Sequence, residues 1–154
     1  MRDARELLPA AGLASHGFEL RAAPSAVDFA DEAEVVGAYY GEVAELVLAA
    51  TGCADVHVFD HTVRRSGATS LNALDGGAAA PVPRVHCDYT HDGAPRRLRL
   101  LAEGGMRSHK LGRVLTEAEG LALLEGRFAF VNVWRSIDAG GPPRPRAPHP
   151  HVPQ

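Results

Sequence analysis

Apolar residues recur at three- and four-residue steps between Asp31 and Ala50, and this spacing predicts an amphipathic helix. Either Asp28 or Asp31 can cap its start, and Gly52 suits a left-handed residue after its end. A helix with one apolar face is expected to pack on the outside of a sheet. The positions on that face are Val35, Val36, Tyr39, Val43, Leu46, Val47 and Ala50.

Two later segments, 55–64 and 127–137, alternate between apolar and polar residues and are rich in β-branched or aromatic side chains, which predicts strands. In the first, the alternation places Asp60 on the face opposite to His57 and His61. In the second, a buried strand must satisfy the polar groups of Asn132 and Arg135, through either a structural hydrogen-bond network or a cavity with polar contents. One face of this second strand holds Phe128, Phe130, Asn132 and Trp134.

The remaining elements are short. Thr116 and Glu119 match a capping box, which predicts a helix through Glu125 that Gly126 ends. Residues 96–103 fit a short helix or a strand, and residues 92–95 are expected to form a turn or loop. Residues 65–83 are expected to form a loop, either a substrate lid or a disordered connection.

At 154 residues the chain is expected to form one domain, with an irregular segment over 1–30 and a domain over 31–141. The proline-rich residues 142–154 are expected to be a disordered tail. A net charge of −3 and a pI near 6.2 give no basic field for nucleic acid or an anionic membrane. No apolar run is long enough to cross a bilayer, and two cysteines make no disulfide framework. A cytoplasmic protein is the default expectation.

The segment 84–90 holds the candidate chemistry. As an extended strand it would place His86 and Asp88 on one side and Cys87 on the other, where Cys87 is expected to be a small core residue. An imidazole and a carboxylate at this spacing form two corners of a three-point metal site suited to non-haem Fe(II), with a second His from a distant strand as the third corner. The same triplet also occurs on many solvated strand faces.

Three pieces in fixed order, residues 56–64, 85–90 and 131–135, resemble a family of Fe(II)/2-oxoglutarate-dependent oxygenase-like proteins. It includes hydroxylase/desaturase and gibberellin desaturase-like proteins and the component labelled a methyltransferase in cephamycin methoxylation. The resemblance implies a mainly β fold with packed helices, a double-stranded β-helix (jelly-roll). It implies Fe(II) and 2-oxoglutarate as cofactors, His86 and Asp88 as metal ligands, and Asn132 and Arg135 as candidate cofactor-binding residues.

Relatives of this kind carry a distal His after the segment that matches 131–135, whereas here only His149 and His151 follow, each between prolines. Neither looks like a strand-held third ligand, so we expect a partial jelly-roll that is incomplete at the C-terminus, with a weak or absent iron site. Apolar surface left by missing strands would favour self-association.

The expected function is that of a hydroxylase/desaturase-type oxidoreductase, acting on a small molecule such as a biosynthetic intermediate of secondary metabolism. One alternative is a non-catalytic remnant or binding module of the same fold. A second is the methyltransferase activity of the label, which is disfavoured because no Gly-rich turn follows a strand.

Overall fold

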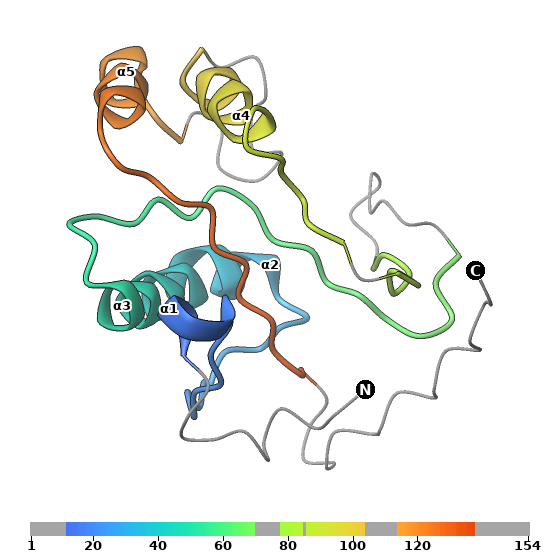
Figure 1. Cartoon of the computed structure of the whole chain (residues 1–154). Helices are drawn as coiled ribbons and strands as arrows, with labels where there is room; N and C mark the ends of the chain where they lie inside the picture. The colour runs from blue at the N-terminus through green and yellow to red at the C-terminus, as the bar shows by residue number, and fades with distance from the viewer. Residues whose placement is uncertain (1–11, 70–77, 85, 104–113, 138–154) are drawn as a thin grey trace.

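The computed structural model describes residues 12–69, 78–84, 86–103 and 114–137, and its regular elements are helices joined by extended segments (Figure 1). The elements α4 and α5 lie together at one end, whereas α1, α2 and α3 lie at the other, and residues 127–137 run between the two groups (Figure 1). The bounds are α1 Leu13–His16, α2 Glu32–Glu34, η2 Val35–Tyr39, α3 Tyr40–Thr51, α4 Gly93–Ala102 and α5 Glu117–Glu125.

The helix predicted from Asp31 onward is confirmed, since α2, η2 and α3 follow one another without a break. The Asp31 carboxylate accepts hydrogen bonds from the backbone N–H groups of Ala33 (2.8 Å) and Glu34 (3.4 Å), which are otherwise unpaired donors of the first turn. At the other end Gly52 has φ of 66°, the left-handed conformation that glycine adopts without strain.

One turn of this helix, η2, is a π-helix, and it changes which residues are buried. A π turn holds one more residue than an α turn, so it rotates the following residues relative to a regular helix. The buried residues are accordingly Val35, Tyr40 and Val47, whereas Tyr39, predicted on the apolar stripe, is only half-buried. The regular helical period could not show this shift.

The helices α4 and α5 pack against each other and enclose a small core of Leu98, Leu101 and Leu115. Residues 96–103, which fitted a helix or a strand, are helical through Ala102. The turn or loop predicted over 92–95 is confirmed only at Asp92 and is wrong for residues 93–95, because α4 begins at Gly93. Pro95 is tolerated there because N–H groups of a first turn have no helical partner.

The capping box that opens α5 is confirmed: the Thr116 hydroxyl accepts from the Glu119 N–H (3.2 Å), and the Glu119 carboxylate accepts from the Thr116 N–H (2.7 Å). The helix ends at Glu125, as predicted. Gly126 follows it with φ of −99°, an extended conformation rather than a left-handed one.

The jelly-roll prediction is wrong for the described residues. Within them no strand forms, and the only bridge that the structure gives is an isolated parallel one between Arg64 and Ala79. Two backbone hydrogen bonds make it, from the Ala79 N–H to the Val63 carbonyl (2.8 Å) and from the Arg65 N–H to the Ala79 carbonyl (2.9 Å). The described residues are therefore helical and extended, not mainly β.

The physical reason is that alternation reports which side chains are apolar, not whether a neighbouring backbone lies within hydrogen-bond reach. The predicted strands 55–64 and 127–137 are extended, but they meet through side chains. The rings of Phe59 and Phe130 lie 5.6 Å apart edge to face, and the rings of Tyr89 and Phe130 lie 4.5 Å apart.

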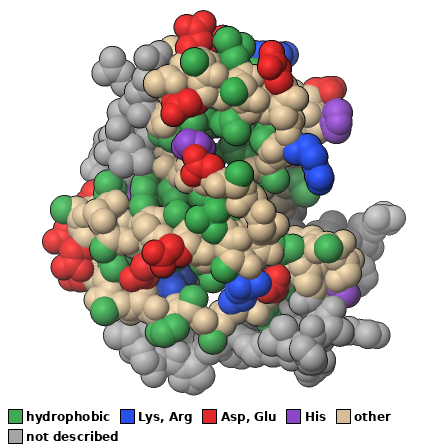
Figure 2. Space-filling model, turned by 90° about the vertical axis from the view of Figure 1, so that its left-hand side faces the viewer, with side chains coloured by type: hydrophobic (Ala, Val, Ile, Leu, Met, Phe, Trp, Pro, Cys, Tyr) green, Lys and Arg blue, Asp and Glu red, His purple; other side chains and the backbone are tan. Residues whose placement is uncertain are grey.

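Several apolar side chains remain at the surface, and Figure 2 shows hydrophobic groups lying among acidic ones on one face. Trp134 is 69% exposed, and the prediction that Cys87 is a core residue is wrong, since its side chain is exposed. None of the helices in the described ranges is both long and apolar enough to cross a membrane. The other exposed large apolar residues are Phe18, Leu20, Leu121, Val131 and Val133.

Candidate functional site

His86 and Asp88 lie side by side, with 3.2 Å between the imidazole Nε2 and the carboxylate Oδ1. Both side chains face solvent in part, at 50% and 41% exposure. They follow the end of the described segment 78–84 and precede α4. The two residues singled out by their spacing thus present a nitrogen and an oxygen at an accessible position.

Both ring nitrogens of His86 face an oxygen that can only accept. Nδ1 lies 3.0 Å from the backbone carbonyl of Arg84, and this contact is a hydrogen bond in the tautomer that carries the proton on Nδ1. In that neutral tautomer Nε2 has a lone pair, which faces Oδ1 of Asp88 at 3.2 Å. Two acceptors face each other favourably only when a cation lies between them, either a proton on Nε2 or a metal ion.

Asn132 contacts the same carboxylate from a segment 44 residues later in the chain. Its side-chain amide Nδ2 donates to Asp88 Oδ2 at 2.5 Å, so the two carboxylate oxygens have different partners. Two of the three pieces that carry the family resemblance therefore meet at Asp88.

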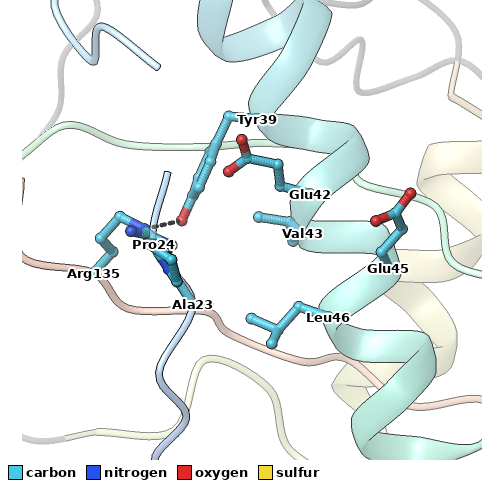
Figure 3. A pocket seen from close by; sticks show the side chains of 8 residues that line it. All are labelled: Ala23, Pro24, Tyr39, Glu42, Val43, Glu45, Leu46 and Arg135. Carbon is cyan, nitrogen blue, oxygen red and sulfur yellow. Dashed lines mark hydrogen bonds between the residues drawn. The ribbon is translucent and has the colours of Figure 1, made fainter. Parts of the chain in front are cut away.

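Arg135 is engaged elsewhere. Its Nε donates to the Tyr39 hydroxyl at 3.0 Å, one terminal nitrogen donates to the Ala23 carbonyl, and the guanidinium lies 5.3 Å from the centre of the Tyr39 ring. A cavity of about 330 Å³ opens beside it, between residues 23–24 and α3 (Figure 3). The cavity is lined by Ala23, Pro24, Tyr39, Glu42, Val43, Glu45, Leu46 and Arg135.

No third metal-ligand side chain joins His86 and Asp88 in the part of the chain that the structure describes. His57 contacts Asp55 (3.3 Å), and His61 contacts both Tyr40 (2.8 Å) and Glu32 (3.4 Å). The downstream candidates His149 and His151 lie outside the described residues.

The contact between Tyr40 and His61 was not foreseen, because the sequence put Tyr39 rather than Tyr40 on the buried face. Tyr40 is 8% exposed, and its hydroxyl shares a 2.8 Å hydrogen bond with His61 Nδ1. Burial, followed by the negative charges of Asp60 and Glu32, raises the pKa of Tyr40 to about 12. The acidic residues Glu32 and Asp60 were a weak sequence signal for this cluster. The π turn left no signal in the sequence.

A comparison with protein families shows the family to which the chain belongs. The family model described as "YDMC: Oxidoreductase/YMDC permease-like domain" matches residues 1–143, and the chain belongs to this family. The resemblance to hydroxylase/desaturase and 2-oxoglutarate-dependent oxygenase proteins is confirmed by curated relatives that carry those names.

The chain is 31% identical over 137 residues to the hydroxylase/desaturase CTB9 of Cercospora beticola, covering 81% of this chain and 38% of that protein. It is 32% identical over 131 residues to the alpha-ketoglutarate-dependent dioxygenase phiK of a fungal species, covering 81% and 41%. An uncharacterised Methylophilus leisingeri protein is 30% identical over 141 residues, covering 80% and 64%. The chain thus spans less than two thirds of these relatives, and no solved structure matches it at comparable significance.

Proposed function

We propose that this chain carries the His-x-Asp part of the iron site of a non-haem Fe(II)/2-oxoglutarate-dependent oxidoreductase of the hydroxylase/desaturase type. The substrate is a small molecule. The observation that carries the proposal is the 3.2 Å separation between His86 Nε2 and Asp88 Oδ1, with the other nitrogen of His86 committed to a carbonyl. The names of the relatives support the choice of cofactors.

The two donor atoms fit neighbouring positions around one ion. Ligand atoms about 2.1 Å from a metal and a right angle apart lie roughly 3.0 Å from each other, close to the observed separation. One neutral nitrogen and one carboxylate are also the donor types of the facial site with open positions that non-haem Fe(II) oxygenases use. The partial exposure of both side chains leaves room for further ligands.

Bound Fe(II) with 2-oxoglutarate and oxygen supplies the oxidation of a substrate C–H bond. Among the residues of this chain, His86 would offer the Nε2 lone pair in the tautomer whose Nδ1 proton is donated to the Arg84 carbonyl, and Asp88 would offer a negative oxygen that offsets part of the ion's charge. That Asn132 and Arg135 hold the cosubstrate stays a prediction.

Two protein ligands bind a divalent ion weakly compared with three, because each missing donor is replaced by water. We therefore propose that the site made by the described residues is impaired and would gain affinity for the ion if 2-oxoglutarate supplied further ligand atoms.

Anaerobic titration with Fe(II), with and without 2-oxoglutarate, tests the proposal through the metal-to-ligand charge-transfer absorbance. We expect a band only at high Fe(II) concentration, abolished by His86→Ala and by Asp88→Ala. His91→Ala is the matched control, because His91 also contacts an adjacent carboxylate, that of Asp92, at 3.4 Å, and both side chains are fully exposed. Absence of any band, or an equal band in His86→Ala, would contradict the proposal.

Product analysis distinguishes the proposed oxygenase from the alternative of a non-catalytic binding module. An oxygenase converts 2-oxoglutarate to succinate when oxygen is admitted to the loaded protein, whereas a binding module shows the band without succinate formation.

A further inference from the structure

We infer that Asn132 is a positioning residue that determines which oxygen of Asp88 faces His86. The inference rests on the proposed function for the identity of the ion at this site, but the hydrogen bond on which it is built exists without metal. The side-chain hydrogen bond of Asn132 is to Asp88 and not to His86, so the role inferred here acts through the Asp88 carboxylate.

A carboxylate on an exposed segment has two equivalent oxygens and a broad rotation about its last bond, so by itself it presents neither oxygen in a fixed direction. Asp88 is such a group, with 41% of its side chain exposed. The Asn132 amide removes the equivalence, since Nδ2 donates to Oδ2 at 2.5 Å while Oδ1 remains 3.2 Å from His86. A hydrogen bond to an ionised acceptor is among the stronger ones in proteins, so this contact can hold the carboxylate plane.

The position of Asn132 is itself fixed by the core. Phe130 lies two residues earlier in the same extended segment, and its ring packs on the cluster around Leu98 and Leu101. The same ring lies 4.5 Å from the ring of Tyr89, the residue after Asp88. Two neighbouring contacts, Phe130 with Tyr89 and Asn132 with Asp88, thus join the extended segment to the His-x-Asp segment and connect the site to α4 and α5.

The amide suits this position for an electrostatic reason. A carboxylate at residue 132 would repel Asp88, and an apolar side chain would leave Oδ2 to water, which does not fix its orientation. Outer partners of this kind typically change metal affinity about 10- to 100-fold when they are removed. A role in holding Asp88 predicts a change in the coordination of a bound ion, whereas a purely structural role predicts only a change in stability.

The test uses the full 154-residue chain with Co(II) as a coloured probe ion, measuring affinity and the visible ligand-field spectrum. We expect Asn132→Leu, of similar size without the donor, to weaken Co(II) binding about 10- to 100-fold and to change the spectrum. Asn132→Gln, which keeps the donor, should recover part of both. Ser136→Ala is the matched control on the same segment, where residue 136 is exposed, and should match the wild type.

A second measurement needs no metal: the side-chain amide NMR signals of Asn132 should shift in the Asp88→Ala variant and stay unchanged in Asp92→Ala. If the wild type fails to bind Co(II), the proposed iron site is wrong while this NMR shift still decides the hydrogen bond. The inference is overturned if the wild type binds Co(II) and Asn132→Leu binds it with the same affinity and the same spectrum. It is also overturned if the Asn132 amide signals do not shift in Asp88→Ala.

Discussion

Gly120 of α5 faces Ala102 of α4 so closely that a Cβ atom on Gly120 would lie 2.2 Å from the Ala102 Cβ. Both residues are buried, and α4 and α5 enclose the core on which Phe130 packs. Since Phe130 lies two residues before Asn132, this helix contact supports the segment that bonds Asp88. The glycine is required by the close approach of two helices.

Gly120→Ala should therefore destabilise the protein by about 1–3 kcal/mol, as overpacking of a buried contact does. Denaturant unfolding measures the change, and Ala102→Gly in the same chain should restore part of it by reopening the space. Gly41→Ala is the matched control: a Cβ there meets nothing within 4 Å, so helix propensity predicts slight stabilisation. Equal changes in unfolding free energy for Gly41→Ala and Gly120→Ala would show that α4 and α5 do not make this close contact.

Removing the cap of α5 by Thr116→Ala should cost about 1 kcal/mol of unfolding free energy at neutral pH. The Thr116 backbone N–H, and then its hydroxyl, lower the pKa of Glu119. The stabilisation tied to this carboxylate is thus present above the ordinary Glu pKa and is lost as pH falls through the lowered value. The variant keeps the Thr116 backbone N–H, so only the hydroxyl's hydrogen bond to the Glu119 carboxylate (2.7 Å) makes the difference between wild type and Thr116→Ala depend on pH. This difference in unfolding free energy should narrow slightly in acid; a difference that widens in acid would contradict the hydroxyl contact.

Tyr40→Phe should destabilise the protein by about 1–3 kcal/mol, because it removes the hydroxyl that shares a part-buried hydrogen bond with His61 Nδ1. The pKa of Tyr40, about 12, lies above its ordinary value of 10.0. Its contribution is therefore fully present below pH 10 and is lost as pH rises toward 12. Unfolding free energies of the two proteins should converge above pH 10. Tyr89→Phe is the comparison, and a gap that widens with pH would rule out the raised pKa.

Arg135→Ala should lower the unfolding free energy by about 1–3 kcal/mol, since it leaves the Tyr39 hydroxyl and the Ala23 carbonyl without their donor and removes the stacking on Tyr39. Arg127→Ala, at an exposed position of the same segment, should change stability little. Calorimetric measurement of 2-oxoglutarate binding to both variants distinguishes a structural role of Arg135 from a role in binding the cosubstrate. Unchanged stability with lost cosubstrate affinity would assign Arg135 to the cosubstrate instead.

The sequence predicted helix ends best where side chains or backbone of neighbouring residues determine them, as at Asp31, Gly52 and the Thr116–Glu119 capping box. It failed at η2, because a π turn leaves no mark on a 3.6-residue period, and Tyr40 was therefore missed. It failed for the sheet, because alternation in 127–137 cannot say whether a neighbouring backbone is within reach.

For the candidate site, spacing was sufficient to single out His86 and Asp88, which are local in sequence and adjacent in space. Spacing could not show that Asn132 bonds Asp88 while Arg135 contacts Tyr39, because those contacts join residues 44 and 96 positions apart. Long-range pairs depend on how segments pack, and a single sequence holds no signal for that.

Whether His86 and Asp88 hold one divalent ion is tested by adding substoichiometric Mn(II) to the full chain while the imidazole NMR signals of its eight histidines are followed. Paramagnetic broadening falls steeply with distance from the ion. We expect the His86 signals to broaden first and Asp88→Ala to abolish this preference. Uniform broadening of all histidines, or a different histidine broadening first, would contradict it.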